Sequence, residues 1–269
     1  MLKINRKYAI ILAIVAFSSF QTEAKAASIS MLGTASNFGV LGGSTVTNTG
    51  PSVITESLGV STGSSATGFP PAIVNGTIFT SDTVAAQAQV DNATAYNKLA
   101  SLIPNKDLTG LDLGGLTLTP GVYSFSSSAQ LTGILTLDNL GDPNALFVFQ
   151  IGSTLTTASN SSIVTTNGDA PNVFFQIGSS ATLGTGTQFM GNILALTSIT
   201  LTTGVNIDCG RALAQNGAVT MDTNKVSNAC YTKPQEKAVV PEPDSSLAVL
   251  GSGLVSLLFA FRKRFRKGW

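Results

Sequence analysis

The side chains that most often carry out catalysis are scarce in this chain of 269 residues, which contains no histidine. The absence of histidine excludes the usual catalytic triads, metal centres with histidine ligands and the commonest general base. Paired carboxylates could still hydrolyse a glycosidic bond. The aspartates in question are Asp138, Asp142, Asp169, Asp208 and Asp222. Asp142-Pro143 and Gly168-Asp169 have the composition of turns, so we expect structural roles for them and predict no catalytic site and no enzyme.

Motifs for a nucleotide or a metal are missing as well. The Gly42-Gly43 pair lacks the spacing and the lysine of a phosphate-binding loop. The chain has two cysteines but no CxxC pair and no histidine, which argues against a metal site. We therefore predict no cofactor and no metal.

Four segments of the chain resemble one another, and they define the elements that would position any site. They are Phe147–Thr157, Val173–Thr185, Asn192–Thr203 and Arg211–Thr223. Each begins with an apolar strand, turns at Gly or Ser, and continues as an alternating Thr-rich strand before a third short segment. Three strands per turn at a period near 20 residues indicate a triangular β-helix, in which stacked coils share one core.

The register of these coils follows from their inward residues. Taking Leu183, Leu201 and Met221 as equivalent gives steps of 18 and 20 residues. Leu155 to Leu183 is 28 residues, and we assign the excess to a loop at 167–172. The N-terminal segment Phe38–Gly68 has similar strands, which we expect to stack out of sequence order.

Side chains alternate between the two faces of a strand, so the neighbours of these inward residues point outward on one flank. The predicted outward positions are Thr45, Thr47, Ser65, Thr67, Thr132, Thr154, Thr156, Thr182, Gly184, Thr200, Thr202 and Thr220, with weak positions at Gln130, Gly184 and Asp222. β-Propensity alone also favours threonine, but it would mix Lys, Glu and Arg into an exposed face. Such a flat, nearly uncharged flank suits a repeating ligand, such as ice or an ordered polysaccharide.

One segment does not follow the strand pattern. Ser81–Leu102 has an apolar stripe and contains neither Gly nor Pro, Ser81 or Asp82 can cap its start, and Pro104 lies just beyond its end. We predict a helix at about 82–102 that lies along one flank and covers the core.

Cys209 and Cys230 are 21 residues apart, which is about one coil. That spacing places them on neighbouring rungs, within reach of a disulfide. In an exported chain we expect the bond to form, with two free thiols as the alternative.

Both ends of the chain have the composition of processing signals. Residues 1–26 combine basic residues, a short apolar stretch and an Ala-Lys-Ala site, which predicts a secretory signal peptide. Residues 238–269 contain Pro241-Glu242-Pro243, an apolar run at 245–261 and a basic cluster. That run is at the lower limit for spanning a membrane, so a permanent single-span anchor is the alternative to a sorting signal.

The remaining body, 27–237, forms a single predicted domain. It holds six basic and eleven acidic residues, for a formal net charge of −5. A mildly acidic body without a basic stripe argues against nucleic acid as a partner.

Two resemblances add to these predictions. The C-terminal tail is similar to the PEP-CTERM sorting signal of Gram-negative bacteria, which implies export, transient membrane anchoring, and release to the cell surface or matrix by the sorting machinery. The body resembles the microbial ice-binding domain family over nearly all of Ser30–Val226. The motifs that carry this resemblance are Leu32–Phe38, Gly114–Tyr123, Asp142–Ala145, Phe149–Ser153, Gly191–Ala195 and Gly210–Ala214.

The family implies a mainly β fold, a right-handed discontinuous β-solenoid with one long α-helix packed alongside, and an ice-binding flat face at the outward positions named above. We therefore expect an exported ice-binding protein that contacts the membrane only through its terminal signals. The alternative is a non-enzymatic matrix or adhesion module that binds exopolysaccharide. A polysaccharide-acting β-helix enzyme is a third hypothesis, and it requires a cleft with paired carboxylates.

Overall fold

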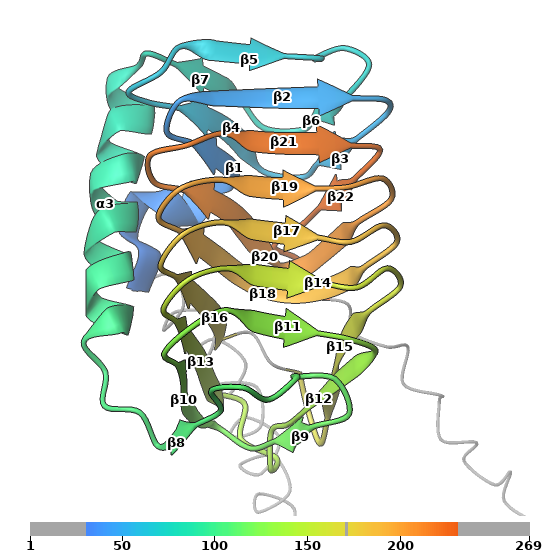
Figure 1. The fold of residues 1–269 in the computed structure, drawn as a ribbon. Helices are drawn as coiled ribbons and strands as arrows, with labels where there is room; N and C mark the ends of the chain where they lie inside the picture. The colour runs from blue at the N-terminus through green and yellow to red at the C-terminus, as the bar shows by residue number, and fades with distance from the viewer. Residues whose placement is uncertain (1–30, 170–171, 231–269) are drawn as a thin grey trace, which may run out of the picture. The chain divides into compact units, whose positions relative to one another are not determined.

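The computed structural model describes residues 31–169 and 172–230, and these residues form a stack of coils beside one helix (Figure 1). Each full coil contributes one strand to each of three flanks, and all pairings between coils are parallel. The predicted fold class, a mainly β discontinuous solenoid with one long helix alongside, is confirmed.

The first flank is a seven-stranded sheet of short strands. In stacking order it consists of β11 (Ala129–Leu131), β14 (Leu155–Thr157), β17 (Ala181–Leu183), β19 (Ile199–Leu201), β21 (Val219–Asp222), β2 (Thr45–Thr49) and β5 (Ser65–Thr67).

The other two flanks form one 15-stranded sheet that bends around a corner. The second flank contains β8 (Lys106–Asp107), β10 (Gly121–Phe125), β13 (Leu146–Ile151), β16 (Asn172–Ile177), the later parts of β18 (Gln188–Ala195) and β20 (Asn206–Ala214), then β1 (Phe38–Gly42), β4 (Ser57–Val60) and β7 (Ile78–Thr80). The third flank contains β9 (Thr117–Leu118), β12 (Ile134–Asp138), β15 (Ser162–Thr166), the first parts of β18 and β20, then β22 (Lys225–Val226), β3 (Val53–Ile54) and β6 (Ile73–Val74).

Glycines make the corner inside β18 and β20. Gly191 has φ +111°, and the β18–β20 register shifts around it, between Met190 and Asn192. A Cβ on Gly210 would lie 1.8 Å from the carbonyl oxygen of Gly191, so only glycine fits where the two bends stack.

The order of coils in the stack differs from their order in the chain. The C-terminal strand β21 pairs with the N-terminal strand β2, β20 pairs with β1, and β22 pairs with β3. The N-terminal coils therefore extend the stack beyond the C-terminal coil, as Figure 1 shows by blue strands lying next to orange ones.

The interior is filled by apolar side chains from all three flanks. A row of rings runs through it, with centroids 5.6 Å apart for Tyr123 and Phe149, 4.5 Å for Phe149 and Phe175, and 4.8 Å for Phe175 and Phe189. Stacked rings of this kind contribute beyond the area that they bury, so they add to the packing between successive coils.

The helix α3 (Thr83–Ala100) covers the second flank. Asp82 caps its N-terminus, where Asp82 Oδ1 accepts a hydrogen bond of 2.5 Å from the backbone N–H of Val84. Its small inward residues, such as Ala88 and Ala95, pack against Phe174 and Leu194 of the sheet. A short 3₁₀ helix, η1 (Gly33–Asn37), packs beside α3.

Cys209 and Cys230 form a disulfide, with their Cα atoms 4.2 Å apart, and the predicted pairing is confirmed. The predicted signal peptide at 1–26, the Pro241-Glu242-Pro243 motif and the apolar run at 245–261 lie outside the described residues. Among the residues that the structure does describe, no helix combines the length and apolarity needed to cross a bilayer.

Candidate functional site

A single row of threonines crosses six adjacent strands of the first flank, and we call it the central column. Each member is paired directly with the next: Thr156, Thr182, Thr200, Thr220, Thr47 and Thr67. Gln130 continues the row at the β11 end. With a strand spacing of about 4.8 Å, the six threonines extend over roughly 24 Å.

The hydroxyls of the central column are available to a ligand. None of the six makes a hydrogen bond to another described residue. Thr67, Thr156, Thr182 and Thr220 are exposed, while Thr47 and Thr200 are half-buried. The column thus presents a methyl group and an unsatisfied hydroxyl at every rung.

Hydroxyls on either side of the column are used within the protein. Thr154 Oγ1 donates to Ser128 Oγ over 2.8 Å, and Ser198 Oγ accepts from the N–H of Ala218 over 3.2 Å. On the opposite side, Thr202 Oγ1 donates to the carbonyl of Leu183 over 2.7 Å. These bonds join neighbouring coils and make the flank stiff.

The other predicted outward residues lie at the margins of the column. Thr45 and Ser65 are paired with each other two residues before the column's Thr47 and Thr67 along their strands. Thr132 and Gly184 follow the ends of β11 and β17, at the corner of the coil. A Cβ on Gly184 would lie 2.6 Å from the carbonyl oxygen of Thr157, so this glycine is a close contact between coils and leaves no gap in the face.

The predicted equivalence of Leu155 with Leu183 is wrong. Leu155 pairs with Ala181, 26 residues later, and Thr157 occupies the inward position that Leu183 has in the next coil. Thr157 is only 3% exposed, and its hydroxyl is hydrogen-bonded to Thr187 Oγ1 over 2.8 Å. The predicted register was therefore wrong by two residues, because Thr157 points inward and its hydroxyl is hydrogen-bonded inside the core.

Because of the same register error, two of the serine hydroxyls beside the column were not among the predicted outward positions. Ser180 and Ser198 stand beside Thr182 and Thr200, and Ser180 Oγ accepts from the N–H of Ser198 over 3.3 Å. The Phe-Gln-Ile-Gly-Ser motif is present at Phe149 and again at Phe175, 26 residues apart. Aligning that motif would have given the observed register.

The centre of the flank carries no charge. In its seven strands the only charged residue is Asp222, at the last position of β21. Its carboxylate accepts hydrogen bonds from Thr203 Oγ1 over 2.5 Å and from Thr223 Oγ1 over 3.0 Å. This charge lies at the end of β21, two residues beyond Thr220, and the positions beside the other rungs of the column are neutral.

The other aspartates have partners in turns or in an ion pair. Asp138 Oδ1 accepts from the N–H of Leu140 over 2.9 Å and from Asn167 over 2.8 Å, and these two bonds hold the pKa of Asp138 below its usual value. Asp142 Oδ1 accepts from the N–H of Asn144, and Asp208 lies 3.7 Å from Lys225 Nζ. The Asp169 carbonyl accepts from Asn139. These roles agree with the turn chemistry expected at Asp142.

The arrangement of the chain has counterparts among known proteins. Residues 40–227 match the family model described as ice-binding-like. The chain belongs to this family. Residues 239–264 match the PEP-CTERM protein-sorting motif, as the tail's resemblance predicted.

The relatives of this ice-binding-like chain include bacterial and fungal proteins named as ice-binding proteins. It is 40% identical over 150 residues to ice-binding protein 1 of Shewanella frigidimarina, covering 53% of this chain but only 17% of that longer protein. An ice-binding protein of Flavobacterium frigoris is 32% identical over 215 residues, covering 73% of this chain and 75% of its own length. The crystal structure of an ice-binding protein from an Antarctic biological consortium superposes with a TM-score of 0.71 at 49% identity, covering 73% and 89% of the two chains.

Proposed function

We propose that this chain is an exported, non-enzymatic ice-binding protein that adsorbs to ice through the first flank, with the central column as the contact. The observation that carries the proposal is the row of six directly paired threonines whose hydroxyls make no hydrogen bond to another described residue. Membership of the ice-binding-like family and the names of the relatives support it.

The physical argument concerns repetition and rigidity. A crystal surface repeats at fixed intervals, so a matching protein surface has to repeat at fixed intervals as well. The sheet supplies one outward threonine per rung, and the hydrogen bonds beside the column keep the rungs in register. Because the hydroxyls are fixed before binding, little conformational entropy is lost on adsorption.

Export is supported by the two ends of the chain. The match to the PEP-CTERM motif favours sorting through a membrane to the surface of a Gram-negative cell. We propose that 1–26 is removed as a signal peptide, that 245–261 anchors the protein transiently, and that Pro241-Glu242-Pro243 is read by the sorting machinery.

An ice-recrystallisation assay on the purified protein tests the ice contact. Thr200→Tyr places a bulky ring on a middle rung of the column, and Val164→Tyr places the same ring at an exposed position of the third flank. We expect wild type and Val164→Tyr to inhibit recrystallisation at similar concentrations and Thr200→Tyr to lose most of the activity. Full activity in Thr200→Tyr, or none in wild type, would contradict the proposal.

A further inference from the structure

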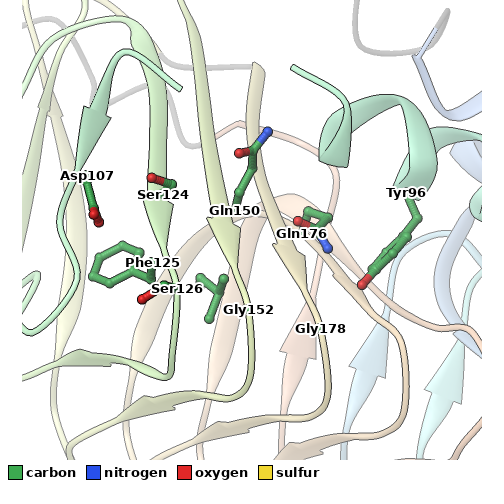
Figure 2. A pocket seen from close by; sticks show the side chains of 10 residues that line it. Tyr96, Asp107, Ser124, Phe125, Ser126, Gln150, Gly152, Gln176 and Gly178 are labelled. Atoms are coloured by element: carbon green, nitrogen blue, oxygen red, sulfur yellow. The ribbon is translucent and has the colours of Figure 1, made fainter. Parts of the chain in front are cut away.

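A polar groove lies on the second flank, next to the C-terminal end of α3, whereas the central column lies on the first flank. The cavity has a volume of about 360 Å³. Figure 2 shows its side chains in a row across neighbouring strands, from Asp107 through Ser124, Gln150 and Gln176 to Tyr96 of the helix. This volume falls within the range of sites that bind small molecules.

The register explains why the groove is polar. Asp107 pairs with Ser124, Ser124 with Gln150, and Gln150 with Gln176. The same row then continues as Leu194 and Leu213, which are buried under α3. The row is thus apolar where the helix covers the sheet and polar where the helix has ended, at Ala100.

Among these polar side chains, Gln150 has an evident structural role. Gln150 Nε2 donates to the carbonyls of Leu99 and Leu102 over 2.7 and 2.8 Å. These bonds satisfy carbonyl groups at the end of the helix that would otherwise lack a partner. The structural role of Gln150 is therefore to bind the carbonyl groups at the end of α3.

The side chains of Gln176 and Ser124 make no hydrogen bond to a backbone group of the described residues. Gln176 is only 7% exposed, and its carboxamide contacts the hydroxyl of Tyr96, an interaction that lowers the pKa of Tyr96 against the larger effect of burial. The Ser124 hydroxyl has no partner among those residues. A carboxamide has two donors and an acceptor oxygen, so the Tyr96 contact leaves Gln176 with hydrogen-bonding capacity toward the groove that it lines.

The ends of the groove add an aromatic surface and an acceptor. Tyr96 reaches the groove from α3, and its hydroxyl lies 3.4 Å from the carbonyl oxygen of Ile177. A tyrosine hydroxyl is protonated at neutral pH and can donate a hydrogen bond, and burial raises the pKa of Tyr96 further. At the other end, Asp107 lines the groove, and its Oδ1 accepts from the N–H and the hydroxyl of Thr109, while its second oxygen makes no hydrogen bond to the described residues.

We propose that this groove binds a short, neutral saccharide. Amides, a hydroxyl and a carboxylate oxygen in a row match the alternating donors and acceptors of sugar hydroxyls, and an aromatic side chain offers an apolar surface to the faces of the rings. The carboxylate at one end disfavours anionic sugars. The site is separate from the ice contact and does not depend on it.

Saturation-transfer difference NMR on the purified full-length protein tests the proposal, with glucose, N-acetylglucosamine and cellobiose as neutral probes and glucuronate as the anionic one. We expect transfer to at least one neutral probe and weaker transfer to glucuronate. Gln176→Leu, which matches the Leu194 and Leu213 of the same row, should weaken binding by about tenfold or more, and Ser124→Ala by roughly three- to tenfold. Thr200→Tyr should bind like wild type.

Circular dichroism and thermal melting establish that each variant is folded. If Gln176→Leu does not fold, Ser124→Ala, at a half-buried position, provides the same comparison. Absence of transfer to every neutral probe overturns the proposal, as does equal transfer in wild type and Ser124→Ala. Because Thr200→Tyr is scored separately for ice and for saccharide, failure of one proposal is distinguishable from failure of the other.

Discussion

Thr182 and Thr200 are paired directly across β17 and β19, and the hydroxyls of both are free of hydrogen bonds to other described residues. They are middle rungs of the central column, with threonines on both sides. The effect of a substitution on ice binding should therefore depend on which rung of the column is changed.

A bulky residue at a middle rung should harm ice binding more than the same residue at the end. A tyrosine at Thr200 lifts the neighbouring rungs on both sides away from a planar ligand, whereas Thr67→Tyr leaves five rungs in one uninterrupted row. We expect the inhibitory concentration in the recrystallisation assay to rise severalfold more for Thr200→Tyr. An equal effect of the two substitutions would show that the column does not act as a unit.

Arg211 connects the N-terminal segment to the rest of the stack. This arginine is 6% exposed and donates to the Ser36 carbonyl over 2.9 and 3.1 Å and to Asn192 Oδ1 over 2.8 Å. Burial lowers the pKa of Arg211, and nearby Glu56 opposes that shift. A lysine cannot reproduce the planar fork of donors.

We therefore expect Arg211→Lys to lower the free energy of unfolding by about 2–4 kcal/mol in urea titrations. Lys225→Met is the matched control, because Lys225 is an exposed partner of Asp208 at 3.7 Å, and such surface pairs contribute about 0–1 kcal/mol. Similar losses in both variants would contradict the assigned role of Arg211.

The stability of the η1–α3 contact should depend on pH. Asp91 accepts hydrogen bonds from the Thr34 hydroxyl over 2.6 Å and from the Thr34 N–H over 2.7 Å. The hydroxyl bond lowers the pKa of Asp91 most, burial opposes it, and the backbone bond adds to the lowering. A pKa depressed in the folded state gives stability above the unfolded value, about 3.9, which is lost as the pH falls through the folded value.

Asp91→Asn should therefore cost about 1–2 kcal/mol at pH 7 and much less below pH of about 3. Urea titrations of wild type and variant at the two pH values provide the measurement. In a double-mutant cycle, Thr34→Val should remove the share of this contribution that comes from the hydroxyl, because the backbone N–H of residue 34 remains. Additive losses would refute the coupling between these two side chains.

The disulfide closes a loop of 21 residues near the end of the described chain. Chain-entropy arguments for a loop of this size give about 3 kcal/mol. We expect Cys209→Ala with Cys230→Ala to lose that amount of unfolding free energy while recrystallisation inhibition at low temperature persists. Loss of inhibition in a folded double variant would show that the bond also shapes the ice contact.

The repeat pattern was sufficient to predict the solenoid, and the apolar stripe of Ser81–Leu102 was sufficient to predict its helix. The expected out-of-order stacking of the N-terminal segment is also confirmed, but its register, such as Val46 paired with Val219, does not follow from sequence separation alone. For the site, alternation identified the outward threonines, but it cannot distinguish an outward threonine such as Thr156 from an inward one such as Thr157. Their difference lies in the buried hydrogen bond to Thr187, made by another segment of the chain.

Because β2 is paired with β21, the order of the strands in the stack differs from the order in which they are synthesised. Thr47 and Thr67 are synthesised early, but β2 cannot pair with β21 until residue 222 has been synthesised. Contacts between such distant segments slow folding. We therefore expect the coils of Thr47 and Thr67 to join the stack after β21, so that a chain truncated before β21 loses these two rungs of the column as well.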